Sequence, residues 1–262
     1  MRQGTRTIID RRHFTWPYCI SRTFHRPDDP GGMLSVILQT TSGAIHAEDL
    51  LSQRLICQPR GRVTVTTPGA TLVHRAKPHQ TAEERVIIEA GEDSHLEYLP
   101  EPRILFPDSA LCQSLDILCR PGASVLVSDA FTCHDPKGFN SPFRLFQSTV
   151  ICRRDVPIMT DRTWLEGADM ADLHPYRAFG NILMLTEESS LLHETIASLN
   201  GRTSKLTGLY AAASQLPNSA GVSVRMAGVT VQAVRNGIRA SQTAFRLLVR
   251  SESAKAEQNQ LP

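Results

Sequence analysis

The sequence predicts a mainly β fold, an irregular β-helix-like or stacked-sheet scaffold with a few α-helices in its C-terminal third. Short apolar or alternating segments fill the first two thirds, separated by Pro-Gly, Asp-Pro and similar turn signals. No helical pattern lies between these segments, which disfavours a doubly wound α/β sheet. No repeat of fixed period is visible, so any β-helix is expected to be irregular.

Nine segments are expected to be strands: 33–40, 54–58, 62–67, 70–76, 84–90, 94–99, 114–120, 124–131 and 146–156. The clean alternation of 62–67 stops at Pro68 and Gly69. Proline fixes its φ and glycine can adopt positive φ, so this pair predicts a sharp turn. Thr66 and Thr67 are thereby left at a strand end, where their hydroxyls either cap the turn or face a polar cavity.

The last third changes character, and two helices are expected there. One covers 189–200, with serines suited to an N-cap and a stop at Asn200-Gly201. The other covers 230–250, where apolar residues recur at three- and four-residue steps. Those apolar residues are Val231, Val234, Ile238, Phe245 and Leu248, with Ser241 in the one gap. A neighbouring face carries Arg235, Arg239, Arg246 and Arg250. This row predicts either a solvated helix side or a docking stripe for an acidic partner.

Length and composition indicate one domain over residues 1–262, β-rich over 1–165 and more helical over 166–262. Apolar residues make up 41% and charged residues 21%, which is ordinary for a globular chain. A net charge of +2 gives no sign of a nucleic-acid partner. Neither a signal peptide nor an apolar run long enough for a membrane span is visible, so a cytoplasmic location is expected. The six cysteines form no Cys-x-x-Cys pair and are expected to be reduced thiols.

Asp129 is the acid whose position most needs an explanation. Strand alternation places it on one face with Val125 and Val127. A carboxylate on such a face is costly unless it is paired, hydrated or bound to a cation. The alternative is a strand-end aspartate that is hydrogen-bonded to a turn. Glu97 is expected on the face opposite Leu96 and Tyr98.

Other polar residues give weaker signals. Asp49 lies beside Glu48 and three residues after His46, a set that suits cations but also an ordinary loop. Asp161 closes an apolar stretch. The run Cys133 to Asp135 contains the residue types of a nucleophilic triad, but adjacent residues point in different directions. No P-loop and no Gly-x-Ser-x-Gly motif is present.

The order of several stretches resembles the urease accessory protein UreD family, also called UreH. The stretches are SGAIHAED, TTPGATLVHR, LEYLPEPRILFP, VLVSDAF and the strand that ends in Asp161. The resemblance runs to about Trp164 and is most specific at TTPGAT and LEYLP. It departs from the family where Ala44 to Ala47 replace a Gly-rich run and where Asn140 and Ser141 replace a Gly-Glu pair.

The resemblance implies a non-enzymatic scaffold that binds UreF and the GTPase UreG and docks on apo-urease, so that nickel reaches the urease active site. It also implies an internal passage for transient Ni²⁺, without a tightly bound cofactor. The residues that match the family's route are Asp49, Thr66, Thr67, Glu97, Asp129 and Asp161. A loose oxygen-rich lining suits conduction, because a site that binds tightly cannot release its ion. Two alternatives stay open: a β-rich hydrolase or lyase that uses paired acids, and a β-solenoid interaction protein with no metal role.

Overall fold

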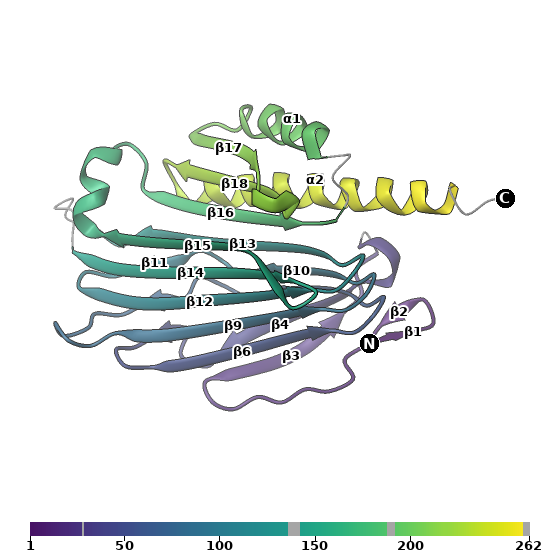
Figure 1. Cartoon of the computed structure of the whole chain (residues 1–262). Coiled ribbons are helices and arrows are strands. Elements are labelled where there is room, and N and C mark those ends of the chain that lie inside the picture. Colours follow the sequence, from purple (N-terminus) through teal and green to yellow (C-terminus); the bar gives the residue numbers. More distant parts are fainter. Residues whose placement is uncertain (28, 136–141, 188–191, 259–262) are drawn as a thin grey trace.

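Two stacked β-sheets form the body of the molecule in the computed structural model, which describes residues 1–27, 29–135, 142–187 and 192–258 (Figure 1). The larger sheet has eleven strands, with the main order β17-β18-β16-β13-β10-β7-β4-β3 and the short strands β5, β8 and β11 beside it. The smaller sheet has five strands in the order β15-β14-β12-β9-β6. The first two strands, β1 (Arg2–Gln3) and β2 (Arg6–Thr7), form a small hairpin apart from both sheets.

The larger sheet contains β3 (Tyr18–Phe24), β4 (Leu34–Thr40), β5 (Ala44–Ile45), β7 (Arg62–Thr66), β8 (Leu72–Val73), β10 (His95–Leu99), β11 (Arg103–Leu105), β13 (Ser124–Cys133), β16 (Ala178–Leu185), β17 (Leu209–Gln215) and β18 (Gly221–Gly228). The smaller sheet contains β6 (Leu50–Cys57), β9 (Ala82–Ala90), β12 (Ser109–Cys119), β14 (Phe143–Arg153) and β15 (Val156–Glu166). The helices are α1 (Leu192–Thr203) and α2 (Val231–Gln258), with the 3₁₀ turns η1 (Pro30–Gly32), η2 (Gly167–Leu173) and η4 (Pro217–Ser219).

The chain coils between the sheets as a β-helix. Each of three coils has a long strand in the larger sheet, a short strand, and a long strand in the smaller sheet: β4-β5-β6, β7-β8-β9 and β10-β11-β12. Equivalent strands of successive coils pair in parallel. These coils start at Leu34, Arg62 and His95, and β13 follows at Ser124. The spacing is unequal, which explains why the sequence shows no fixed repeat, and the predicted irregular β-helix is confirmed.

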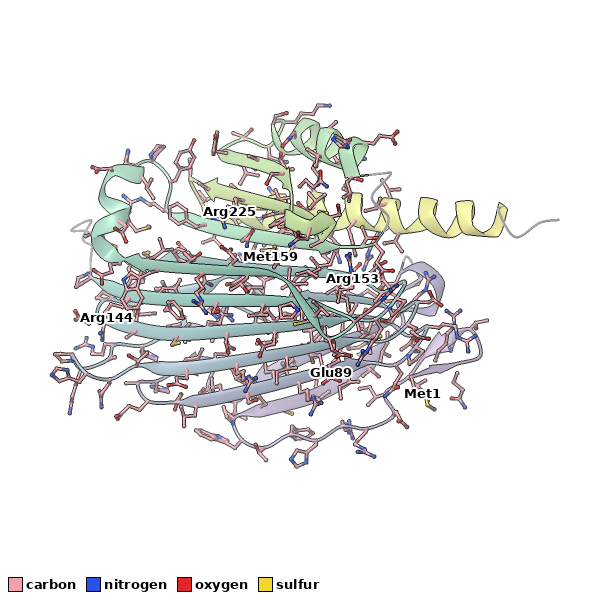
Figure 2. The ribbon with its side chains drawn as sticks, viewed as in Figure 1. Met1, Glu89, Arg144, Arg153, Met159 and Arg225 are labelled. Atoms are coloured by element: carbon pink, nitrogen blue, oxygen red, sulfur yellow. The ribbon has the colours of Figure 1, made fainter. Side chains whose placement is uncertain are left out.

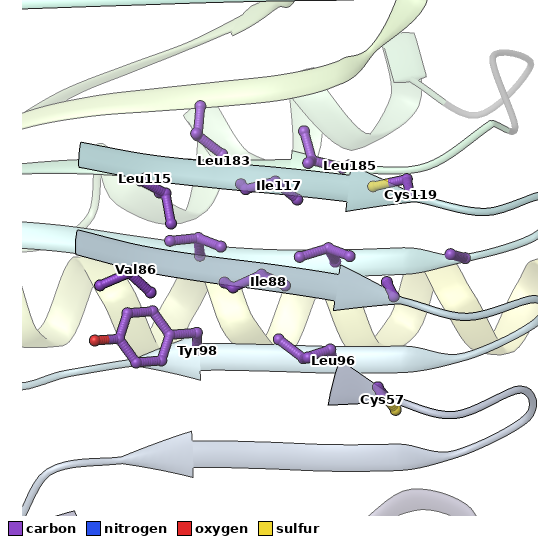
Figure 3. Packing of buried hydrophobic residues seen from close by; sticks show 14 of the residues in the cluster. Cys57, Val86, Ile88, Leu96, Tyr98, Leu115, Ile117, Cys119, Leu183 and Leu185 are labelled. Atoms are coloured by element: carbon purple, nitrogen blue, oxygen red, sulfur yellow. The ribbon is translucent and has the colours of Figure 1, made fainter. Parts of the chain in front are cut away.

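The main core lies between the two sheets. In β9 the inward residues alternate with outward ones, so that Val86 and Ile88 are fully buried. Figure 3 shows both of them against Leu96 and Tyr98 of the facing sheet. Full burial of each aliphatic side chain contributes about 1.5–3 kcal/mol, so this alternation is the main source of fold stability.

A second core lies on the outer face of the larger sheet, which helix α2 covers. The Oγ1 of Thr230 accepts from the Ala233 amide at 3.2 Å and caps the helix start. Phe245 and Leu248 are buried there against the sheet, as the helical spacing predicted. Ser241, the gap in the apolar series, is also fully buried, and its hydroxyl has no partner among the described residues.

Several elements differ from the expectation. The last third also contains β16, β17 and β18, which extend the larger sheet antiparallel. The segment 146–156 divides at Arg154 and Asp155, whose φ values of 51° and 65° make the turn between β14 and β15. Helix α1 continues past Asn200 to Thr203, and its expected serine cap lies outside the described residues. All six cysteines are free, and no helix in the described ranges is long and apolar enough to cross a membrane.

Candidate functional site

Asp129 lies inside the molecule, in the middle of β13, with its carboxylate toward the smaller sheet. It accepts from Nη1 of Arg103 at 2.5 Å and from the amide of Gln147 on β14. Val125 and Val127 share its face and are buried in the core, as predicted. Of the two explanations for this acid, the structure therefore supports pairing with a cation and not capping of a turn.

Arg103 joins the half-buried Asp129 to a second acid, the buried Glu84 of β9. Its Nη2 donates to Oε2 of Glu84 at 2.5 Å, and both side chains are only 6% exposed. Gln53 donates to Glu84 at 3.1 Å, and Tyr98 donates to Gln53 at 3.0 Å. These contacts continue the polar cluster from Asp129 to the first coil of the β-helix.

Burial and mutual charge set the protonation of this cluster. Burial raises the pKa of Asp129, and the Glu84 charge adds to that effect, while Arg103 opposes it. Burial alone would lower the pKa of Arg103, but Glu84 and Asp129 outweigh it and raise that pKa. Arg103 is therefore held as a cation between two acids. With both acids ionised, the triad of Glu84, Arg103 and Asp129 carries one net negative charge.

A row of polar side chains crosses the inner face of the smaller sheet beside the triad. The register pairs Glu84 with Gln113, Gln113 with Gln147, and Gln147 with Thr163. All four residues are buried or half-buried. Since aligned residues of neighbouring strands lie side by side, this row is a continuous band of oxygen and amide groups in the core.

Two cavities flank the triad. The first, of about 150 Å³, is lined by Thr67, Glu84 and Arg103, among others. The second, of about 250 Å³, is lined by Asp129 and Asp161. The ion-paired triad thus contributes to the lining of both cavities, with Glu84 and Arg103 on the first and Asp129 on the second.

Asp161 lies in the middle of β15 and not at the end of a strand. Its carboxylate accepts from Nη2 of Arg225 on β18 at 3.0 Å. Figure 2 shows Arg225 above β15, and its ion pair with Asp161 links β18 of the larger sheet to β15 of the smaller sheet. Asp161 and Asp129 thus face the same cavity, each bound to its own arginine.

Glu97 lies on the opposite face of the larger sheet, toward α2, as its alternation with Leu96 and Tyr98 predicted. Its carboxylate is fully buried and accepts from Arg246 at 2.7 and 2.8 Å. It also bonds to His95 at 3.0 Å and accepts from Gln242 at 2.7 Å. Burial alone would raise the pKa of Glu97, but the bonds to His95 and Arg246 outweigh it and lower that pKa to about 2.

The two hydroxyls before the Pro-Gly corner have different surroundings. Thr67 donates to the Gly69 carbonyl at 3.1 Å and accepts from the Glu101 amide at 2.9 Å, so it caps the turn. Thr66 instead lines a polar cavity between β7 and α2. Gly69 is not among the residues with positive φ, and a Cβ there would contact nothing. Pro68, not the freedom of the glycine, therefore accounts for the corner.

Asp49 lies in the turn before β6. Its Oδ2 accepts from the His46 amide at 2.8 Å, which is a turn-capping contact. Neighbouring Glu48 has a φ of 65° and accepts from Gln80 at 2.7 Å. This arrangement matches the ordinary-loop explanation of the acidic run.

The six predicted route residues therefore lie in three places. Thr67, Asp129 and Asp161 line the cavities between the sheets, Thr66 and Glu97 face α2, and Asp49 lies in a turn. Their metal role stays a prediction. The described residues contain no group of three or more His, Cys, Asp or Glu side chains placed to hold a metal ion.

Sequence reasoning missed Glu84 and Arg103. The alternation of β9 contained the signal, because Glu84 falls on the same face as Ala82, Val86 and Ile88. Glu84, like Asp129, is a carboxylate on an apolar strand face and therefore needs a partner there.

The Cys133 to Asp135 run is not a nucleophilic site. Burial raises the pKa of the Cys133 thiol to about 12, with a further effect of Asp135. A thiol with that pKa is not ionised at neutral pH and is a poor nucleophile. The ring of His134 stacks on Phe106 at 4.5 Å. Asn140 and Ser141, where the chain departs from the family pattern, lie outside the described residues.

The arginine row on α2 fits neither of its two explanations completely. Arg235 pairs with Glu101 at 2.6 Å, and Arg246 pairs with Glu97 and Asp29. These partners lie on the body of the same chain, so both arginines fasten α2 to it. Arg239 is exposed.

Comparisons with known proteins find similar sequences over nearly the whole chain. The model of the UreD urease accessory protein family matches residues 1–259. Urease accessory protein UreD 2 of Bradyrhizobium sp. strain ORS 278 is 45% identical over 94% of this chain and 87% of its own length. The protein of the same name from strain BTAi1 is 43% identical over the same shares. Urease accessory protein UreD 1 of Pseudomonas syringae pv. syringae is 31% identical over 92% of this chain and 86% of its own length.

The match covers both sheets and both helices, and thus extends past the stretches in which the resemblance was first seen. Membership excludes the alternative of a hydrolase or lyase, because this family consists of accessory proteins and not of enzymes. The chain belongs to the UreD family of urease accessory proteins.

Proposed function

We propose that this chain is required for nickel insertion into apo-urease and conducts Ni²⁺ through the space between its two sheets. In this proposal the chain stands between apo-urease and a complex of UreF-type and UreG-type accessory proteins, the latter a GTPase. The names of its relatives support a role in urease maturation. Its six free cysteines suit a reducing compartment, and we place it in the cytoplasm.

The observation that carries the nickel role is the polar path through the apolar core. It runs from the Thr67 cavity, past Glu84, Arg103 and Asp129, to the cavity of Asp161. Buried charges are costly, so a core built for stability alone would have apolar residues there. Oxygen ligands that are spread along a path attract a dication without enclosing it.

Arg103 supports the competing proposal of a passive scaffold. Its guanidinium is already paired with both Glu84 and Asp129, so neither acid is free to bind an incoming ion while these pairs hold. On the conduit proposal, Ni²⁺ moves only when Arg103 is displaced. On the scaffold proposal, the triad only holds the two sheets together.

Urease activation with purified accessory proteins distinguishes the two. Asp129→Asn and Asp161→Asn remove one charge each from the second cavity, and Asp116→Asn is the matched control. Asp116 lies on the exposed side of the smaller sheet and pairs with Arg85 at 2.9 Å. The conduit proposal expects less nickel and less activity in urease with Asp129→Asn and Asp161→Asn, and no change with Asp116→Asn.

Pulldown of UreF and apo-urease with each variant shows whether the complex still forms. Loss of nickel delivery from an intact complex supports the conduit. If both cavity variants form intact complexes and deliver nickel normally, the conduit proposal is wrong and only the scaffold role is supported. If the wild-type chain captures neither partner, the assembly role itself is wrong.

A further inference from the structure

A cavity between α2 and the outer face of the larger sheet contains an excess of arginine side chains. Its volume is about 180 Å³, which is enough for several water molecules or a small oxyanion. Arg26, Arg235, Arg239 and Arg246 all line it. It lies on the α2 side of the sheet and not in the space between the sheets.

The acids around this cavity do not balance its arginines. Arg246 is bound by Glu97 and Asp29, and Arg235 by Glu101. Among the described residues, four guanidinium groups thus stand against three carboxylates, an excess of one positive charge. The guanidinium groups of Arg26 and Arg239 make no hydrogen bond or ion pair with the described residues.

Hydroxyl groups complete the set of donors. Thr64 lines the cavity and is only 5% exposed, yet its Oγ1 has no partner in the described part of the chain. An unpaired buried hydroxyl costs free energy. The Thr64 oxygen is closed off from solvent in this structure, so a ligand recovers that cost only after the side chain rotates toward the cavity. Thr66 lies two residues further along the same face of β7.

We propose that this cavity binds a small inorganic oxyanion of the phosphate or carbonate class, held by Arg26 and Arg239 and contacted by Thr64. Guanidinium groups bind the oxygens of such anions in pairs, with charge-assisted hydrogen bonds. No aromatic side chain is among the described lining residues, so nothing there would stack a nucleobase. This inference goes beyond the nickel proposal and does not depend on it.

The test is titration of the purified full-length chain with inorganic phosphate and, separately, with bicarbonate, followed by calorimetry. We expect saturable binding of at least one of them by the wild-type chain, with competition if both bind. Arg239→Gln and Arg26→Gln should each weaken binding about tenfold, since each removes a charged donor. Thr64→Val keeps the shape of the side chain and should weaken binding by a smaller factor.

Arg162→Gln is the matched control. Arg162 is an exposed residue of β15 in the other sheet, and the substitution changes the net charge by the same amount. We expect its affinity to stay within about twofold of the wild type, because a distant exposed charge is screened by salt.

Circular dichroism of each variant shows whether α2 remains folded. If one of the variants Arg26→Gln and Arg239→Gln does not fold, the other still tests the proposal. Absence of saturable binding of both anions to the wild-type chain would overturn the proposal. Equal loss of affinity in Arg162→Gln and Arg239→Gln would overturn it too, since that indicates a general charge effect.

Discussion

Arg246 of α2 donates from both Nε and Nη2 to the two carboxylate oxygens of Glu97 on β10, at 2.7 and 2.8 Å. The same guanidinium donates from Nη1 to Asp29 at 3.1 Å. One arginine therefore joins three segments: the second core's helix, the centre of the larger sheet and the loop before β4. This contact makes the position of α2 sensitive to the charge on Glu97.

Glu97→Gln should destabilise the fold by about 1.5–3 kcal/mol, because it weakens a buried charge-assisted hydrogen-bond pair. Urea denaturation followed by circular dichroism measures this change. Glu89→Gln is the matched control, since Glu89 pairs with exposed Arg54 at 2.6 Å. Its effect should be below about 1 kcal/mol, as for other surface pairs. Equal effects would contradict a special role of the Glu97 pair.

The stabilising effect of Glu97 should also depend on pH. Its pKa in the folded chain is lowered to about 2, below the ordinary value of 4.5. The ionised carboxylate is therefore favoured by folding, and its contribution is complete above about pH 4.5 and is lost as pH falls toward about 2. The gap in unfolding free energy between wild type and Glu97→Gln should narrow over that range.

The pH dependence of stability at Asp129 should have the opposite sign to that at Glu97. Burial raises its pKa in the folded chain, so the folded state holds the proton more readily than the unfolded state does. In this case acidification should favour the wild type relative to Asp129→Asn. Urea titrations at several pH values below neutrality measure the difference in unfolding free energy between the wild type and each variant. If both differences changed in the same direction with pH, the opposite pKa shifts of Glu97 and Asp129 would be contradicted.

Arg103→Met should cost about 3–5 kcal/mol, because it leaves the buried Glu84 and the half-buried Asp129 without their cation. Adding Glu84→Gln and Asp129→Asn to the same chain should recover much of that loss, since no unpaired charge then remains. Arg85→Met is the matched control on the exposed side of β9, where Arg85 pairs with Asp116. A triple variant as unstable as Arg103→Met alone would show that packing, and not charge, gives Arg103 its importance.

Two glycines should respond in opposite ways to replacement by alanine. A Cβ on Gly69 would contact no atom, and its φ is in the ordinary range, so Gly69→Ala should be neutral or stabilising by up to about 1 kcal/mol. Gly221 has a φ of 141°, and a Cβ there would overlap the Met184 carbonyl oxygen. Gly221→Ala should therefore cost about 2 kcal/mol or more. Thermal unfolding of both variants measures the difference, and a stable Gly221→Ala chain would contradict the geometry.

The strands of the β-helix could be predicted because each of them repeats a local two-residue alternation. The same alternation predicted that Asp129 shares a face with Val125 and Val127. It also predicted that Glu97 lies on the face opposite Leu96 and Tyr98. Both predictions are confirmed. The alternation does not show which side chain of another element contacts a given residue. Arg103 and Asp129 are 26 positions apart, and Arg246 and Glu97 are 149 apart, so these pairings depend on the coiling of the chain.

The strands β16 to β18 were missed for a related reason. Their strands pair antiparallel, whereas the β-helix strands of the same sheet, from β4 to β13, pair in parallel. Nothing local in the sequence shows that β16 joins β13 or that β18 and β17 follow it in the sheet. The arginine row was likewise interpreted from its own helix alone, whereas Glu97, Glu101 and Asp29 lie on other elements.

The contact of Arg246 with Asp29 has a consequence for biosynthesis, because 217 positions separate the two residues. The three coils leave the ribosome first, while Glu97 still lacks the guanidinium that neutralises it in the finished protein. Only when α2 emerges can that carboxylate be closed off from water with its countercharge in place. The outer face of the larger sheet is thus covered last, and a chain cut off before Arg246 would expose the Glu97 carboxylate on that face.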